Sequence, residues 1–390
     1  MQTNNPISVI HSTPVWLPQT MTWLYHQIRF LSPEIRSHIL CERTENLEQF
    51  NLPHIHCSEN ENSFQKIWDY VLKTLRVSPY FSHKTRVTKK LKAGILHSHF
   101  GNRGWSDIGL AQLKCLKHIV TFYGYDVNRL PLLHPKWKMR YAQLFDHANL
   151  ILCEGNHMAE CIQKLGCPRE KTKVHHLGID LEKISFKPRS WTAGDPLRFL
   201  ISATFKEKKG IPNALEALGR LKGKIPFHIT IIGDAVQETG SLKEKEKIFN
   251  ILEKYRLFPQ THLLGFQPMN VLIKKAYKHH IFLSPSITAE DGDTEGGAPV
   301  TILEMLASGM PVVSTYHCDI PGIIQHKKSG LLSEERNIDE LTENIQWLAE
   351  NPAEWVSLVE TGRSHIENEF DAKNQGIRLA RIYQELLNQP

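Results

Sequence analysis

The sequence predicts an α/β protein built from two doubly wound, Rossmann-like domains in tandem, each a parallel sheet covered by helices on both faces. Short apolar runs rich in β-branched residues alternate with helical patterns along the chain. This alternation breaks once, over residues 186–196, and then restarts. The length of 390 residues also exceeds what a single hydrophobic core usually supports.

The N-terminal domain is expected to span residues 1–185. Helical patterns over 20–31, 62–75 and 156–165 separate its strands. The predicted strands are ISVIHS (from Ile7), SHILCE (from Ser37), GILHSHF (from Gly94), HIVTFYG (from His118), NLILCE (from Asn149) and TKVHHLG (from Thr172).

The segment 186–196 (FKPRSWTAGDP) is the predicted linker, because two prolines, a glycine and small polar residues interrupt the rhythm. A C-terminal domain over 197–370 follows, and 371–390 is predicted as a terminal helix. Its predicted strands are LRFLISA (from Leu197), FHITIIGD (from Phe227), THLLG (from Thr261), HIFLSPS (from His280) and PVVST (from Pro311). Ligands of such sheets bind outside the carboxyl ends of the strands, so we expect the two domains to face each other across a cleft that holds the site.

Composition excludes several classes of protein. No apolar run is long enough to span a bilayer, and the N-terminus lacks the features of a signal peptide, so a cytoplasmic location is expected. The seven cysteines form no pair with metal-ligand spacing, which predicts reduced thiols and no metal site. The net charge of +6 is modest and no basic stripe is present, which argues against a nucleic-acid partner.

Two basic clusters in the N-terminal half suit an anionic membrane surface, although a solvated charged face is the commoner explanation of such clusters. The first comprises Lys84, Arg86, Lys89, Lys90 and Lys92. In the second, HPKWKMRY, the aromatic residues Trp137 and Tyr141 lie among Lys136, Lys138 and Arg140.

The segment DGDTEGGAPVTILEMLASGMPVVST, residues 291–315, carries the sharpest chemical signal. An acidic loop leads through Gly296, Gly297 and Ala298 to Pro299, a residue favoured where a helix begins. The free N–H groups and positive dipole end of that helix form an anion site. Glu295 precedes the helix and Glu304 lies within it. Two carboxylates beside an anion site suit a sugar attached to a diphosphate; a capped core helix with two solvated glutamates is the alternative.

Three further segments place polar residues after predicted strands. SATFKEKKGIPNAL, from Ser202, clusters Lys206, Lys208 and Lys209 before Gly210, and these lysines could neutralise a diphosphate or form a solvated turn. HSHFGNRGW contributes His99 and Arg103, and TFYGYDV contributes Tyr123 and Asp126. These four could contact an acceptor or serve the fold alone.

These segments together resemble the retaining glycosyltransferases of family 4, which have the GT-B architecture. Residues 291–315 are similar to the family's donor signature, in which the first Glu meets the transferred sugar and the second the ribose hydroxyls. The resemblance assigns these roles to Glu295 and Glu304, with eight residues between them instead of the usual seven. Lys209 and Gly210 match the element "G-R-x-x-x-x-K-G" that grips the diphosphate. Thr204 stands in the arginine position, and Lys206 is the candidate substitute.

The N-terminal segments resemble "H-x-H-F-G" and "T-F-H-G-x-D". Tyr123 occupies the position of the histidine near the reacting sugar, which makes His99 the better candidate for that contact. Met21 stands where an acceptor-side acid is usual.

The resemblance implies retaining transfer of a hexosyl unit from a nucleoside diphosphate sugar to a glycan or lipid-linked acceptor in surface polysaccharide or lipopolysaccharide synthesis. Glu295, Lys209 and His99 would be catalytic, and no metal or other cofactor is required. Asp291 and Asp293 form a D-x-D string, which we interpret as loop acid and not as a metal site. Two other functions remain open: a nucleotide-sugar epimerase of the same architecture, and a binding protein that has lost catalysis.

Overall fold

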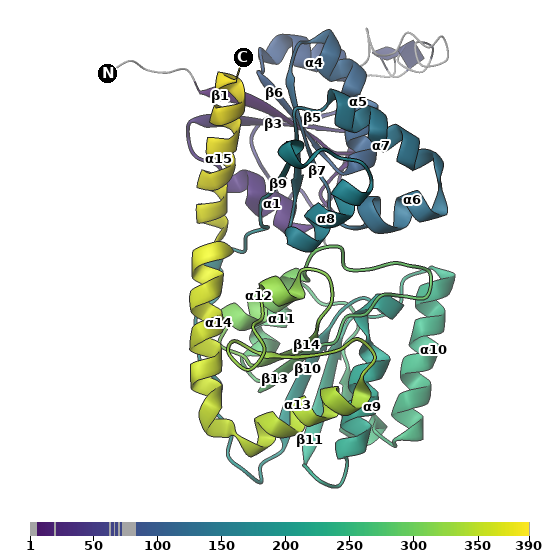
Figure 1. Cartoon of the computed structure of the whole chain (residues 1–390), viewed down its shortest axis with the longest axis vertical. Helices are drawn as coiled ribbons and strands as arrows, with labels where there is room; N and C mark the ends of the chain where they lie inside the picture. Colours follow the sequence, from purple (N-terminus) through teal and green to yellow (C-terminus); the bar gives the residue numbers. More distant parts are fainter. Residues whose placement is uncertain are drawn as a thin grey trace. The chain divides into compact units, whose positions relative to one another are not determined.

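The protein was analysed as a computed structural model, which describes residues 6–18, 21–61, 64, 65, 67, 68, 71 and 83–389. The chain divides into two compact units, each with its own parallel sheet (Figure 1). The N-terminal unit combines residues 1–178 with 372–390, and the C-terminal unit comprises 179–371. The chain therefore changes unit after Gly178 and again after Asp371, whereas the sequence suggested a linker at 186–196.

Arg189 explains why the expected linker belongs to the C-terminal unit. Its buried guanidinium donates hydrogen bonds to the carbonyl oxygens of Ser308 (2.9 Å), Ala276 (3.1 Å) and His279 (3.2 Å). These bonds fasten the proline-containing segment to the body of the unit, so its composition marks an irregular connection and not the boundary itself.

The N-terminal sheet has the strand order β5-β3-β1-β6-β7-β8-β9, and all its pairs are parallel. Because β1 lies between β3 and β6, the direction in which successive strands are added reverses at β1/β6. The strands are β1 (Ile7–Ser12), β3 (Ile35–Cys41), β5 (Ile55–Cys57), β6 (Ile95–His99), β7 (Lys117–Thr121), β8 (Leu150–Cys153) and β9 (Thr172–Val174), with β2 (Val15–Trp16) and β4 (Arg43–Thr44) forming a separate pair.

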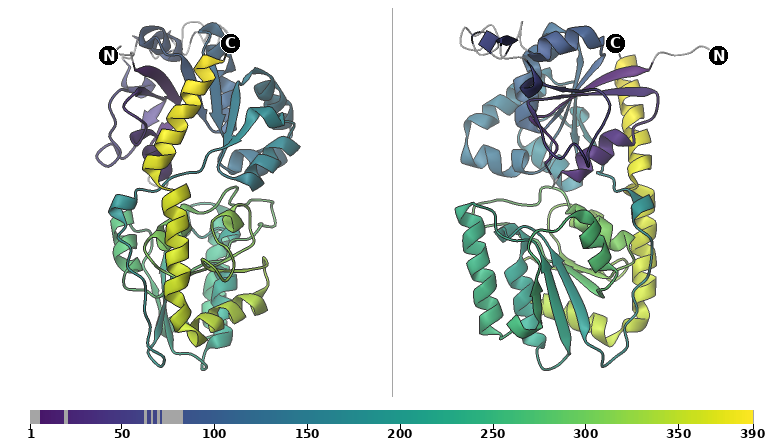
Figure 2. Two further views of the ribbon diagram at one scale, coloured as in Figure 1. Left: turned by 60° about the vertical axis from the view of Figure 1, so that its left-hand side comes forward. Right: turned by 180° about the vertical axis from the view of Figure 1, so that it is seen from behind.

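Helices cover both faces of this sheet (Figure 2). On one face Val9, Ile95 and Ile119 pack against Leu379 and Tyr383 of the C-terminal helix α15, which lies on the N-terminal unit. Helices α5 and α7 cover the other face. The helices are α1 (Thr22–Arg29), α4 (His83–Leu91), α5 (Gly101–Leu113), α6 (Leu130–Leu133), α7 (Lys136–His147), α8 (Asn156–Lys164) and α15 (Ala372–Asn388), with a wide turn at Tyr125–Arg129 and short 3-10 turns at Ser58–Asn60 and Arg169–Lys171.

The C-terminal sheet has the order β12-β11-β10-β13-β14-β15. Its strands are parallel, and the direction in which successive strands are added reverses between β10 and β13. Alternation places Phe199 and Ile201 of β10 in the core under α9 and α13, and Leu200 in the core under α11 and α12. Its strands are β10 (Leu197–Ser202), β11 (Phe227–Ile232), β12 (Thr261–Leu263), β13 (Ile281–Ser284), β14 (Val312–Thr315) and β15 (Leu331–Ser333). Its helices are α9 (Ile211–Leu221), α10 (Thr239–Lys254), α11 (Met269–Ala276), α12 (Val300–Ala307), α13 (Ile338–Glu350) and α14 (Trp355–Glu369), with short 3-10 turns at Leu181–Lys183, Glu207–Lys209, Phe258–Gln260, Ile320–Gly322 and Pro352–Glu354.

All eleven predicted strands are present, so the two Rossmann-like sheets of the predicted fold class are confirmed. The sequence did not indicate the three-residue strands β5 and β15 or the two-residue strands β2 and β4. The predicted helix over 62–75 falls largely outside the described residues, as does the start of the helix predicted over 20–31. No disulfide links the seven cysteines.

Candidate functional site

The predicted donor residues lie at the carboxyl edge of the C-terminal sheet. The loop after β10 carries Thr204, Lys206, Lys209 and Gly210, and the loop after β13 carries Glu295. These two strands are neighbours at the point where strand addition reverses, which is where open α/β sheets bind their ligands.

An ion pair joins the two loops. The Lys209 ammonium lies 2.7 Å from Oε2 of Glu295, and the Ser286 hydroxyl donates to Oε1 of the same carboxylate at 2.8 Å. Burial would raise the pKa of Glu295, but the positive charges of Lys209 and Lys208 outweigh it and lower that pKa. Glu295 is therefore a fixed anion, and Lys209 keeps N–H donors for a second anionic partner.

The three lysines of the loop after β10 have different partners. Lys208 binds the Asp293 carboxylate (3.1 Å) and the Thr294 carbonyl (2.8 Å), which fastens the acidic loop. Lys206 pairs instead with Glu238 (3.3 Å) at the surface. Lys208, which the sequence named only as a member of the lysine cluster, thus contacts the loop after β13 as Lys209 does, and Asp293 is bound to its ammonium group.

Glycine geometry allows these loops to approach each other. Gly210 has φ +60°, and a Cβ there would lie 1.9 Å from the carbonyl oxygen of Pro285 in the neighbouring loop. Gly296 has φ +80°, beyond which Gly297, Ala298 and Pro299 lead into α12, with Pro299 capping the helix start. Only glycine, which has no Cβ, fits at position 210 against the Pro285 carbonyl.

Glu304 differs from the other acids because its carboxylate is buried and has no partner. It is 6% exposed on the middle of α12, and no residue in the described part of the chain donates a hydrogen bond to its side chain. Burial raises its pKa to about 8. The Glu304 oxygens are not among the fully enclosed side-chain atoms that lack a partner, so they remain accessible to hydroxyl donors of a ligand.

Two residues that the sequence did not suggest hold the loop after β13. His317, after β14, accepts the backbone N–H of Glu295 (3.1 Å), and Glu335, after β15, contacts His317 at 2.6 Å. Nothing in their local sequence marks them, since each contact depends on the order of the strands.

Arg103 lies at the carboxyl edge of the N-terminal sheet in a network of buried charges. Its guanidinium donates to the Ser12 hydroxyl (2.8 Å) and the Glu42 carboxylate (2.6 Å), and contacts Asp107 at 3.3 Å. Asp107 also binds the Lys84 ammonium (2.8 Å). Burial opposes ionisation of Asp107, but Lys84 and Arg103 outweigh it and hold its pKa well below the ordinary value.

His99 and Asp126 are buried in the same unit, and Tyr123 is half-buried beside them. The Tyr123 hydroxyl lies 2.6 Å from Nδ1 of His99, and Nε2 of His99 lies 3.1 Å from His11. Asp126 accepts the backbone N–H groups of Gly101 (2.6 Å) and Tyr123 (3.0 Å), while burial raises its pKa to about 6. These residues contact one another, and direct contact of any of them with a sugar stays a prediction.

Ring nitrogens of His11, His97 and His99 converge to within 4.8 Å, close enough to be tested as a metal site. Each nitrogen is already hydrogen-bonded, His97 to Tyr383 (2.7 Å) and Thr121 (2.6 Å). Burial holds the pKa of all three rings below the ordinary value, and the group contains no carboxylate to offset a cation. The donor set therefore fits a hydrogen-bonded core cluster better than a metal centre.

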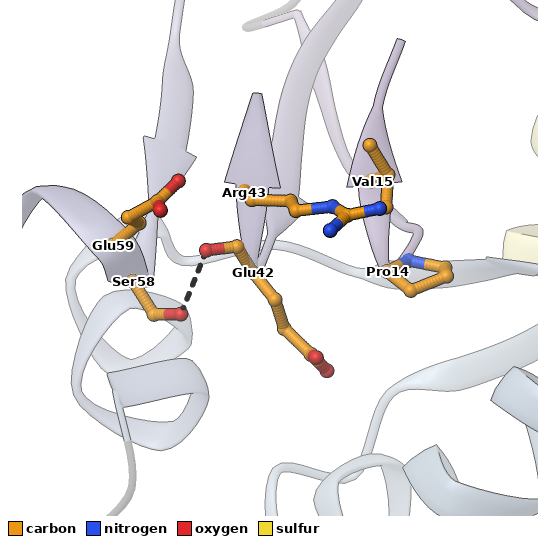
Figure 3. Close-up of a pocket in the computed structure, with 6 residues that line it drawn as sticks. All are labelled: Pro14, Val15, Glu42, Arg43, Ser58 and Glu59. Atoms are coloured by element: carbon orange, nitrogen blue, oxygen red, sulfur yellow. Dashed lines mark hydrogen bonds between the residues drawn. The ribbon is translucent and has the colours of Figure 1, made fainter. Parts of the chain in front are cut away.

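A pocket of about 480 Å³ lies at the ends of β1, β3 and β5, beside Arg103's partner Glu42 (Figure 3). Arg43 pairs in register with Val15, and the Ser58 hydroxyl donates to the Glu42 carbonyl at 3.2 Å. Carboxylates, a guanidinium and a hydroxyl give the pocket a polar character; its lining consists of Pro14, Val15, Glu42, Arg43, Ser58 and Glu59.

The structure also describes Met21 and the first basic cluster of the N-terminal unit. Met21 packs in a core cluster with Trp16 and Leu24. In the first basic cluster, Lys84 and Arg86 are ion-paired with Asp107 and Glu61, which leaves Lys89, Lys90 and Lys92 exposed. No helix among the described residues is long and apolar enough to cross a membrane.

Comparisons of sequence match both halves of the chain to glycosyltransferases. The family described as "Glycosyltransferase Family 4" matches residues 22–183, and "Glycosyl transferases group 1" matches 183–365. The chain is 35% identical to the amylovoran biosynthesis glycosyltransferase AmsK of Erwinia amylovora, over 76% of this chain and 72% of AmsK. It is 30% identical to WcaL of Escherichia coli K12, a glycosyltransferase assigned to colanic acid biosynthesis, over 77% and 73%.

Comparisons of structure give the same architecture. A glycosyltransferase from Rickettsia africae superposes with a TM-score of 0.76 at 17% identity, covering 99% of this chain and 100% of that one. HepE of Anabaena, in complex with UDP and glucose, gives 0.73 at 13% identity, covering 97% and 99%.

Proposed function

The chain belongs to glycosyltransferase family 4 and has the GT-B fold, and from this premise we propose that it transfers a hexosyl unit from a nucleoside diphosphate sugar to a hydroxyl of a glycan or lipid-linked acceptor in surface polysaccharide synthesis, with retention of anomeric configuration. The observation that carries the proposal is the buried, unpartnered Glu304 carboxyl beside the reversal point of the C-terminal sheet.

In this proposal each donor-site residue binds a different part of the donor. Glu304 accepts two ribose hydroxyls, which supply the hydrogen bonds its carboxylate lacks. Lys209 and the free N–H groups around Gly297 stabilise the diphosphate. Glu295, fixed by Lys209 and Ser286, accepts hydroxyls of the transferred sugar.

The transfer step uses no covalent enzyme intermediate. The bond between the anomeric carbon and the phosphate oxygen breaks, and the bond to the acceptor oxygen forms on the same face. The acceptor's proton passes to the leaving phosphate. The protein contributes positioning and charge stabilisation.

The step also proceeds without a metal. Asp293, half of the D-x-D string, is bound to the Lys208 ammonium and so is poorly placed to take a cation. Transfer that continues at full rate in excess EDTA is the expected result, and loss of activity restored by Mg²⁺ or Mn²⁺ would contradict it.

Donor binding tests the proposal first. In thermal-shift measurements with UDP-, GDP-, ADP- and dTDP-sugars, one nucleotide class should raise the melting temperature of the wild-type protein. Glu304→Gln should abolish most of this shift. The matched control is Glu244→Gln, because Glu244 on α10 is also buried with a raised pKa but lies in a different element.

Product analysis then separates transfer from the two alternatives. Donor hydrolysis or glycan extension supports transfer, isomerised donor without acceptor supports an epimerase, and binding without chemistry supports a binding protein.

A surface on α6 and α7 supports peripheral contact with the anionic inner face of the cytoplasmic membrane. Exposed apolar side chains gather there: Tyr125 (47% exposed), Leu132 (59%), Leu133 (48%) and Met139 (67%). Lys136 and Lys138 flank them, and the sequence has no acidic residue from 127 to 145. Apolar side chains with basic neighbours and no carboxylates suit the interface of an anionic bilayer.

Vesicle sedimentation tests this contact. Phosphatidylglycerol vesicles should retain the protein, and phosphatidylcholine vesicles should retain far less. Lys136→Glu with Lys138→Glu should weaken retention by about 1 kcal/mol or more per lysine. Lys224→Glu with Lys243→Glu, an equal charge change on exposed lysines of the C-terminal unit, serves as the control. Equal retention of both double variants would contradict the assignment.

A further inference from the structure

His317 and Glu335 form a brace around the loop that carries Glu295. His317 is buried directly after β14, and its Nε2 accepts the backbone N–H of Glu295 at 3.1 Å. Its Nδ1 lies 2.6 Å from Oε1 of Glu335. A backbone N–H only donates and an ionised carboxylate only accepts, so these partners fix the tautomer: the proton is on Nδ1 and Nε2 is bare.

Glu335 fastens the other end of the same loop. Its Oε2 accepts the backbone N–H of Thr288 at 2.7 Å, seven residues before Glu295. Burial would raise the pKa of Glu335, but the hydrogen bonds from Thr288 and His317 outweigh it and lower that pKa. The ends of β14 and β15 thus hold both ends of the segment 288–295.

The brace acts on the backbone of Glu295, whereas its carboxylate is held separately. Lys209 and Ser286 bind the two carboxylate oxygens. Loss of the His317 bond would leave the charge on Glu295 intact but free its main chain. The direction of the carboxylate, more than its ionisation, therefore depends on His317.

The neighbouring Cys318 suggests an alternative, a nucleophilic Cys–His–Glu triad. Its Sγ lies 3.2 Å from Nε2 of His317. However, that nitrogen already accepts the Glu295 N–H, and burial raises the pKa of the thiol to about 12. A thiol that stays protonated beside an occupied base does not fit a nucleophile.

Several charged groups surround the brace. Arg336 lies 3.6 Å from Glu335, and the Glu295 side chain carries its own partner Lys209. Asp319 follows Cys318 in the same loop. Among the described residues that hydrogen-bond the imidazole, the Glu295 backbone N–H and the Cys318 thiol are neutral and Glu335 contributes a charge.

We propose that His317, oriented by Glu335, is a positioning residue that aims Glu295 at the donor sugar. The inference rests on the proposed transferase function, and it predicts an effect on kcat while nucleotide affinity, which depends on Glu304, is unchanged.

Steady-state kinetics and nucleotide binding test the proposal. His317→Ala should lower kcat about 10- to 100-fold and leave the nucleotide Kd within about twofold. His317→Gln supplies an amide oxygen that can accept the Glu295 N–H, so it should restore most of kcat. Glu335→Gln weakens the bond that orients the ring, so it should lower kcat in the same direction as His317→Ala.

The matched control is His326→Ala. His326 also accepts a backbone N–H, that of Leu332 at 3.0 Å, in the same unit but outside the Glu295 loop. This variant should keep the wild-type kcat. Equal losses of kcat in the two alanine variants, or a kcat in His317→Gln as low as in His317→Ala, would overturn the proposal.

Hydrogen exchange of the peptide containing Glu295 provides a readout independent of catalysis. At pH 8 its exchange should be faster in His317→Ala than in the wild type and in His326→Ala. If no donor is turned over by the wild-type protein, the transferase function fails, while exchange still decides whether His317 holds the loop. Identical exchange in all three proteins would refute the brace.

Discussion

The carboxyl edges of the two sheets gather similar side chains but satisfy them differently. In the N-terminal unit, Asp107 is fully buried and already has two cations and a serine as partners. In the C-terminal unit, Glu304 is nearly as buried and has no donor among the described residues. The partners of Asp107 are all supplied by the protein, whereas the Glu304 oxygens lack protein donors and are not fully enclosed, so a ligand can donate to them. From this difference we infer that the acids at the carboxyl edge of the N-terminal sheet support the fold, and that Glu304 at the edge of the C-terminal sheet binds a ligand.

The largest expected effect tests the structural half of this comparison. Asp107→Asn removes the anion shared by the buried Arg103 and the half-buried Lys84, of which Arg103 keeps Glu42, and should cost about 3 kcal/mol of unfolding free energy. Urea denaturation measures this. Arg43→Ala, which removes an exposed pair with Glu45, should change stability by less than about 1 kcal/mol. If both variants lost a similar amount of unfolding free energy, Asp107 would not have the structural role given to it here.

The next effect concerns catalysis at the other edge. Lys209→Ala removes a charge aimed at the proposed diphosphate and should lower kcat about 10²- to 10³-fold. The folded fraction, followed by circular dichroism, should stay close to that of the wild type. A loss of activity that merely follows a loss of folded protein would assign Lys209 to stability.

A smaller effect is the pH dependence that Glu304 gives to stability. Its folded pKa of about 8 lies above the ordinary value of 4.5, so the folded state keeps the proton longer. Stability should therefore fall as pH rises through this interval, by about 2 kcal/mol between pH 5 and 7. Glu304→Gln should remove this slope in denaturation without ligand. An unchanged slope would show that the carboxyl is not held neutral.

Much of the fold and part of the site follow from sequence alone. Apolar runs marked every strand of four or more residues, and the glycine-rich helix start drew attention to Glu295 and Glu304. The three-residue strands β5 and β15 were not predicted, whereas the equally short β9 and β12 were. Lys206 was chosen as the substitute phosphate contact although Lys208 is the lysine that binds the acidic loop, and His317 and Glu335 were not found. These depend on which strand ends become neighbours, which no local pattern encodes.

The smallest effect separates those two lysines. Lys206 pairs with Glu238 at the surface, so Lys206→Ala should change kcat/KM by less than about threefold. Lys208→Ala frees Asp293 and the Thr294 carbonyl and should reduce it more. The reverse order would restore Lys206 as the phosphate contact.

Proton release on nucleotide binding tests the central claim most directly. If ribose hydroxyls donate to the Glu304 carboxylate, binding favours its ionised form and a group with a pKa of about 8 must lose its proton. Calorimetry at pH 7 in buffers of different ionisation enthalpy should detect release approaching one proton per nucleotide in the wild type, and none in Glu304→Gln. The same release from both proteins, or from neither, would contradict the account.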